Sequence, residues 1–230
     1  MVLNIHLSHQ KIMNDLNVTV AVRASLEVAL KGLIKKISNV QVGTSEQFPY
    51  GWGTAGKGRS VWRILEELIT QNLKKHGHEF GILNIRLPGS EVGVYDFEIH
   101  LEGFSNPIYV NIKSAVEGGR TNKDDISKAR GLLKFYETNP THELFIATVS
   151  LRFNVDMSVS LVNVSVVPTA WLPDIYVNPS NNANLQSSQY KNINNAIIRT
   201  NDEFVDELKR AIEVADQKKV RKTKLDELPL

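Results

Sequence analysis

The stretch "VYDFEIHLEGFSNPIYVNIK", which runs from Val94 to Lys113, constrains the fold more than any other part of the sequence. Apolar and polar residues alternate on both sides of a break at 103–107, and this pattern is typical of two strands joined by a turn. Successive strand residues point to opposite faces. We therefore predict that the two strands pair, with apolar side chains on one face and polar side chains on the other.

The polar face of this hairpin would collect an unusual group of side chains. These are Asp96, Glu98 and His100 from the first strand and Tyr109, Asn111 and Lys113 from the second. Oxygen ligands of this kind suit a hard divalent cation, magnesium above all. A lysine beside the cation can orient or deprotonate a water, or stabilise charge that develops on phosphorus. The alternative is a plain antiparallel hairpin whose polar residues face solvent.

The rest of the chain predicts an α/β fold: a single domain, residues 1–230, with a central mixed β-sheet flanked by helices. Helices are expected at about 10–38, 61–75, 124–137 and 201–218, and strands at about 80–86, 92–101, 108–113, 144–153 and 159–167. Ser60 is the expected N-cap of the second helix, and Asp124 or Asp125 is expected to begin the third. No internal repeat or long linker divides the sequence.

Composition narrows the class of protein. The 230 residues are 42% hydrophobic, enough to bury a sizeable core. We expect neither a membrane span nor a signal peptide, because the sequence has no run of eighteen apolar residues and no charged-then-apolar leader. The absence of cysteine excludes disulfides and thiolate chemistry and fits a reducing cytoplasm.

The charge is distributed unevenly, although the net charge of +2 does not by itself indicate a nucleic-acid binder. Residues 113–134 contain six basic and three acidic residues, and residues 218–224 contain five basic and no acidic ones. Such clusters can follow phosphates or can be ordinary solvated surface. The predicted phosphate contacts are Lys57, Arg59, Arg63, Arg120 and Lys123.

A glycine-rich loop and a pair of histidines could each bind a ligand, but each also has a simpler interpretation. The loop "GWGTAGKG" (51–58) has the glycine and lysine spacing of a phosphate-binding P-loop, but Gly58 stands where the magnesium-binding hydroxyl would be. We therefore favour a flexible loop whose amides and cations contact phosphates. His76 and His78 could bind a metal, although histidines near a helix C-terminus are favoured by the helix dipole alone.

The opening stretch resembles the PD-(D/E)xK nuclease superfamily, and its type II restriction endonucleases in particular. The matching elements are Asp96, then Asn111-Ile112-Lys113 at a strand end, followed by Ser114 and a basic loop. The family often has a carboxylate on the preceding helix, where "RILEELI" offers Glu66 or Glu67. Glu66 lies nearer the apolar stripe and is our choice. The resemblance covers about residues 55–155. It departs from the pattern at Tyr95, which replaces proline, and at Asn111, which replaces the second carboxylate.

The resemblance implies a restriction-endonuclease-like fold and a magnesium-dependent, sequence-specific endonuclease that acts on double-stranded DNA as a homodimer. It implies Asp96, Lys113, Asn111 and Glu66 as catalytic residues and Asp96, Glu98 and Glu66 as metal ligands, and it leaves the number of metal ions open. The helix at 10–38 is the candidate dimer contact. A structure-selective repair nuclease and a non-catalytic DNA-binding protein are the alternatives.

A polar segment at 174–201 is the candidate for reading DNA sequence. Between Asn178 and Asn201 it contains eight asparagines and two glutamines, whereas Lys191 and Arg199 are its only cations. Carboxamides can make two bonds to adenine in the major groove, so Gln189 and Asn192 are predicted readers of an A·T-rich site. A polar surface loop is the alternative, because turns also favour asparagine.

Overall fold

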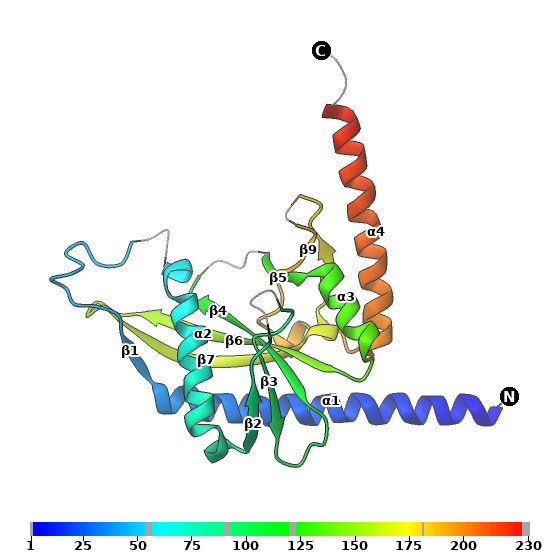
Figure 1. Cartoon of the computed structure of the whole chain (residues 1–230), viewed down its shortest axis with the longest axis horizontal. Coiled ribbons are helices and arrows are strands. Elements are labelled where there is room, and N and C mark those ends of the chain that lie inside the picture. The colour runs from blue at the N-terminus through cyan, green and yellow to red at the C-terminus, as the bar shows by residue number, and fades with distance from the viewer. Residues whose placement is uncertain (1, 54–56, 90–92, 120–122, 181, 227–230) are drawn as a thin grey trace.

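A six-stranded mixed sheet forms the centre of the computed structural model, which describes residues 2–53, 57–89, 93–119, 123–180 and 182–226 (Figure 1). Side chains are described for these ranges except at 2–14, 57–60 and 222–226. The strand order is β1-β7-β6-β4-β3-β2. The strands span β1 Asn39–Gln41, β2 Ile82–Arg86, β3 Phe97–Leu101, β4 Ile108–Val116, β6 Glu143–Phe153 and β7 Ser158–Pro168. Only β4 and β6 run parallel, so the predicted mixed sheet is confirmed.

The predicted hairpin is present, and its surroundings exclude the alternative of a plain solvent-facing hairpin for β4. Strands β3 and β4 pair antiparallel, with Phe97 opposite Val110 and Glu98 opposite Tyr109. However, β4 is a central strand between β3 and β6. Both of its faces are covered, so that Tyr109 and Asn111 are only 8% and 7% exposed. A solvent-facing polar hairpin is therefore wrong for β4, because a second layer packs on that face.

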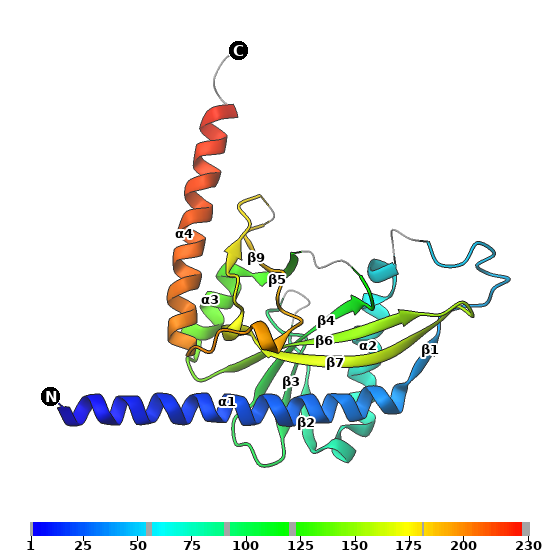
Figure 2. The same ribbon diagram turned by 180° about the vertical axis from the view of Figure 1, so that it is seen from behind.

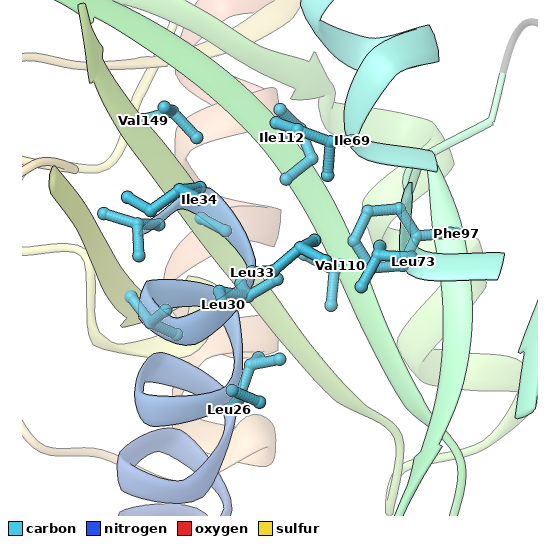
Figure 3. Close-up of a cluster of buried hydrophobic side chains, with 14 of the residues drawn as sticks. Leu26, Leu30, Leu33, Ile34, Ile69, Leu73, Phe97, Val110, Ile112 and Val149 are labelled. Carbon is cyan, nitrogen blue, oxygen red and sulfur yellow. The ribbon is translucent and has the colours of Figure 1, made fainter. Parts of the chain in front are cut away.

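Two helices cover the first face of the sheet: α1 Val2–Ile37 and α2 Lys57–His76. Figure 3 shows leucines of α1 directed at the sheet, with Ile69 of α2 beside Ile112 and Leu73 of α2 beside Phe97. The leucines recur at helical spacing, as Leu26, Leu30 and Leu33, and all are buried. Each such side chain contributes about 1.5–3 kcal/mol when it is fully buried. This packing fixes α2 against β4.

A second hydrophobic cluster covers the opposite face. It is built by α3 Ala129–Thr138, α4 Asn201–Asp226 and the short helix η2 Thr169–Trp171. A small antiparallel sheet joins them, in the order β5-β9-β8, with β5 Asp124–Lys128, β8 Tyr176–Val177 and β9 Asn184–Ser187. Tyr109 of β4, Tyr136 of α3 and Phe204 of α4 are buried in this cluster. Two more short helices, η1 Gly77–Phe80 and η3 Ile193–Asn195, lie in connections.

Several predicted boundaries are wrong, each for a tertiary reason. The third helix begins at Ala129 rather than at Asp124 or Asp125, because residues 124–128 pair with β9, about sixty residues away. Helix α2 already begins at Lys57, so Ser60 is not its N-cap. Helices α1 and α4 also extend beyond the predicted 10–38 and 201–218.

Both terminal helices extend beyond the body of the molecule. The N-terminal part of α1 and the C-terminal part of α4 project from it in different directions (Figures 1 and 2). Within the described ranges, none of the helices is long and apolar enough to cross a membrane.

Glu143, the first residue of β6, is expected to make stability depend on pH. Its carboxylate accepts a hydrogen bond from Thr19 Oγ1 of α1 at 2.7 Å, and burial together with the charge of Asp15 raises its pKa to about 7. The folded state therefore binds this proton more tightly than the unfolded state, whose pKa is near 4.5. Stability should fall as pH rises from about 4.5 to 7 and then level off.

The variant Glu143→Gln should remove this part of the pH dependence. A carboxamide oxygen can still accept the Thr19 hydrogen bond without carrying a buried charge. The variant should be more stable than the parent by about 1–3 kcal/mol at pH 8 and about equal at pH 4. Urea unfolding at both pH values measures the difference, and an equal difference at both would contradict the assignment.

Candidate active site

A cleft of ≈ 590 Å³ lies where α2, β4 and β5 meet. One helical face of α2 forms a wall with Trp62, Leu65, Glu66 and Ile69. Strand β4 contributes Lys113 and its neighbours, and the other wall carries Asp124, Asp125 and Tyr190. Charged groups from three separate elements therefore face one partly enclosed space.

Asp96 is held against β4, where its charge interacts with the cleft residues Glu66 and Lys113. Its backbone N–H donates to Val110 O at 2.8 Å, and its carboxylate Oδ2 accepts from the backbone N–H of Ile112 at 2.6 Å. Burial raises the pKa of Asp96, while the Ile112 hydrogen bond and the charges of Lys113 and Arg63 oppose the rise. The second carboxylate oxygen has no hydrogen bond among the described residues. Asp96 is therefore fixed in place with one oxygen left to act as a ligand.

Glu66 lines the cleft and interacts electrostatically with Asp96, whereas Glu67 does not line the cleft. Burial raises the pKa of Glu66 to about 7, and the negative charge of Asp96 adds to this effect. Arg63 and Lys113 act in the opposite direction. Glu67 is exposed and accepts a hydrogen bond from Gln71 Nε2 at 2.7 Å. Of the two acids considered in the sequence, the structure places Glu66 at the site.

Lys113 is half-buried among carboxylates. Burial lowers the pKa of its ammonium, and the charges of Asp96, Glu66, Asp125 and Asp124 raise it. The four carboxylates come from α2, the segment before β3, and β5, and Lys113 itself lies on β4. A cation in this setting can bind phosphate oxygens or take part in proton transfer.

Asn111 has a structural role that its neutral side chain explains. Its Nδ2 donates to Val94 O at 3.1 Å and to Ile126 O at 3.3 Å, so it joins the segment before β3 to β5. An ionised carboxylate cannot donate either bond. The side chain predicted to be catalytic therefore holds together the two segments that carry Asp96 and the Asp124–Asp125 pair.

Glu98, a predicted metal ligand, lies among different partners. Its Oε1 is 3.6 Å from His100 Nε2 and 3.9 Å from Arg86 Nη1. Within the described part of the chain, no ion pair or hydrogen bond links it to Lys113 or Asp96. The structure thus brings together Glu66, Asp96 and Lys113 and leaves Glu98 apart.

Sequence reasoning missed the role of Asp124 and Asp125, which it assigned to a helix start. Asp124 accepts a hydrogen bond from Tyr190 Oη at 2.5 Å and lies 3.4 Å from Lys191 Nζ. Asp125 accepts from Asn184 and Gln186 at 3.1 and 2.7 Å. Two adjacent acids inside a basic stretch were the signal available in the sequence.

The structure describes the side chains of two of the five predicted phosphate contacts, Arg63 and Lys123. Arg63 is 65% exposed, and its guanidinium lies 4.1 Å from the Trp62 ring at the cleft. Lys123 Nζ lies 4.2 Å from the Tyr176 ring. Arg120 falls outside the described residues, and so do the side chains of Lys57 and Arg59, whose backbones form the first turn of α2.

Most carboxamides of segment 174–201 bind within the protein. Gln189 Oε1 accepts from Asn195 Nδ2 at 2.7 Å, and Asn192 Oδ1 caps η3 by accepting from Asn194 N–H at 3.0 Å. Gln186 holds Asp125. Arg199 is buried and donates to Leu172 O at 2.8 Å, so counting it among cations available to DNA was wrong.

A metal ion at this site would have fewer than three protein ligands. In the described ranges, no group of three or more His, Asp or Glu side chains could hold a metal ion. Magnesium needs no such group, because it keeps several waters and usually binds one or two carboxylates plus substrate phosphate. Asp96 and Glu66 supply two carboxylates whose mutual repulsion a cation would relieve.

Comparisons with known proteins give likenesses of structure and none of sequence family. No family model matches the chain, and no curated protein matches its sequence. Among solved structures, the NlaIV restriction endonuclease is similar over 71% of this chain and 75% of that chain, with 12% identity and a TM-score of 0.44. A likeness this weak carries no argument about function. The fold is described by the strand order and helices given above, and the function is inferred from the residues of the cleft.

Proposed function

We propose that this protein is a magnesium-dependent nuclease that hydrolyses phosphodiester bonds of DNA. The observation that supports it is that Glu66, Asp96 and Lys113 interact electrostatically although they lie on three separate elements, and that Glu66 and Lys113 line one cleft. Two carboxylates can hold a magnesium ion, and a lysine can stabilise charge that develops on phosphorus, so this set suits metal-assisted phosphodiester hydrolysis. The resemblance of Asp96 and Lys113 to the PD-(D/E)xK pattern points to the same chemistry.

The proposed roles follow from the surroundings of each side chain. Magnesium bound by Asp96 and Glu66 would supply positive charge that polarises the phosphoryl group and lowers the pKa of a bound water. Lys113 would bind a phosphate oxygen or orient the attacking water, since its ammonium faces the same space. Arg63 would hold the phosphate backbone at the mouth of the cleft.

The direct test is incubation of the purified protein with mixed phage DNA, with magnesium or with EDTA. Discrete fragments that appear only with magnesium support a sequence-specific nuclease. If the DNA stayed intact both with magnesium and with EDTA, the proposal would be overturned. The alternative of a non-catalytic DNA-binding protein would then be favoured.

The finer proposal is a type II restriction enzyme that acts in the cytoplasm as a homodimer, each subunit cutting one strand. The part of α1 that projects from the body is the proposed contact between subunits (Figure 2). Sedimentation should then give twice the 25.8 kDa of one chain. A monomer that still makes double-strand breaks at one site would contradict it.

An A·T-rich recognition site is also proposed, with Gln189 and Asn192 as readers. Carboxamides match the acceptor and donor of adenine, whereas guanine is best met by Arg or Lys. Sequencing of the fragment ends tests this, and a site made mostly of G·C pairs would exclude it.

The inward hydrogen bonds of the same carboxamides favour a second candidate, a structure-selective nuclease. Side chains such as Gln186 and Gln189 already have partners within the protein. Cleavage of branched DNA in preference to linear duplex would identify this activity.

The two adjacent acids of α2 should differ in their effect on cleavage. Glu66→Gln should reduce the rate by about 10-fold or more and raise the magnesium concentration required, because it removes one of two proposed ligands. Glu67→Gln is the matched control and should change the rate little. Titration of cleavage against magnesium for both variants measures the effect. A larger loss from Glu67→Gln would reverse the assignment.

A further inference from the structure

A second groove of ≈ 460 Å³ lies beside the small sheet, between β8 and α4. One wall is formed by Ile175, Tyr176 and Val177, and the other by Arg210, Val214 and Lys218. The three α4 residues are spaced by four, so they form one stripe on the helix. The groove therefore combines an apolar floor with two cations.

The cations of this groove lack partners, unlike their neighbours on α4. Within the described residues, neither Arg210 nor Lys218 has an ion pair or hydrogen bond, whereas Lys209 pairs with Glu137 at 3.1 Å. The groove's carboxylate, Glu207, pairs with Arg199 at 3.4 Å. The groove thus carries net positive charge, and no side chain in the described part of the chain pairs with Arg210 or Lys218.

Lys123 connects the groove with the proposed catalytic cleft along the chain. Its ammonium lies 4.2 Å from the ring of Tyr176, which lines the groove, and the next residue, Asp124, lines the cleft. The C-terminal end of α4 also points to the same side of the molecule as the first turn of α2, whose following turns border the cleft (Figure 1). A polyanion seated in the cleft would meet Lys123 and then the groove.

We propose that this groove binds the sugar–phosphate backbone of DNA that flanks the segment held in the cleft. Arg210 and Lys218 contact phosphates, and the exposed part of Val214 contacts sugars. This role rests on the proposed nuclease function and extends it to DNA on one side of the cut. Charge complementarity and continuity with the cleft favour nucleic acid over a protein segment as the occupant.

Binding measurements test the two cations. The double variant Arg210→Ala/Lys218→Ala should bind a duplex of about 30 bp roughly 10-fold more weakly in EDTA, and the slope of log affinity against log salt should fall by about two. KM for cleavage should rise while kcat stays unchanged. The control Lys74→Ala/Lys75→Ala removes two exposed lysines from the other end of α2 and should have no effect.

Cross-linking locates the DNA directly, because the chain has no cysteine and a single introduced one is a unique attachment point. A photo-cross-linker on Lys218→Cys should attach to DNA outside the cut site, and one on Lys75→Cys should not. The groove would be excluded as a DNA site if the double variant bound DNA with wild-type affinity and Lys218→Cys gave no cross-link. If Arg63→Ala weakened binding in the same experiments, the nuclease proposal would still stand. Cross-links to a second protein chain would identify a subunit contact and also overturn the proposal. Failure of the wild-type protein to bind DNA would overturn both the groove proposal and the nuclease proposal.

Discussion

Lys113→Met is expected to abolish DNA cleavage while leaving the fold and most DNA affinity in place. Lys113 is the cation that faces Asp96 and Glu66 in the cleft, so its loss removes a group that stabilises charge on the phosphate or positions the water. Removing one such group costs about 10²–10³-fold in rate. Methionine keeps the apolar stem and the packing of β4.

Cleavage of plasmid DNA with magnesium, followed over time, measures the loss. Lys128→Met is the matched control, because Lys128 lies on β5 with an exposed side chain and should be replaceable without effect. Circular dichroism and thermal unfolding show whether the fold persists. A folded Lys113→Met variant that cuts at the wild-type rate would remove Lys113 from the mechanism.

Asp96→Asn is expected to be equally inactive, for a different reason. A carboxamide oxygen can still accept the Ile112 N–H bond, so the backbone arrangement survives, but the negative charge that would hold magnesium is gone. The charge of Asp96 also helps to raise the pKa of Glu66 to about 7. In the variant the pKa of Glu66 should fall, although burial still keeps it above its ordinary value.

Two readouts separate these effects. Magnesium binding followed by calorimetry should be lost, and carboxyl chemical shifts of Glu66 followed against pH in EDTA should show the lower pKa. In EDTA the variant should also be more stable than the parent at pH values where Asp96 of the folded parent is ionised. Burial raises the pKa of Asp96, so the stability that its protonated form contributes is lost as the pH rises through that pKa. Unchanged magnesium affinity would exclude Asp96 as a ligand.

The sequence by itself determined the parts of this protein that depend on local pattern. Alternation from Val94 to Lys113 predicted the β3–β4 pair, and the helical spacing of apolar residues such as Leu26, Ala29 and Leu33 predicted α1. Helical phasing also placed Glu66 rather than Glu67 toward the apolar stripe, where the cleft lies. These features follow from periods of two and 3.6 residues, which a single sequence shows directly.

Only the tertiary structure decided which polar residues share the site. Asn111 and Glu98 have the same strand pattern as Lys113 and Asp96, yet Asn111 donates to two backbone carbonyls and Glu98 faces Arg86 and His100. Residues 124–128 read as a helix start but form a strand, because β9 supplies backbone and side-chain partners from about sixty residues away. Alternation in the sequence predicts which face of a strand a side chain lies on, but it does not predict which helices or strands pack on that face. Burial, hydrogen-bond partners and pKa all depend on that layer.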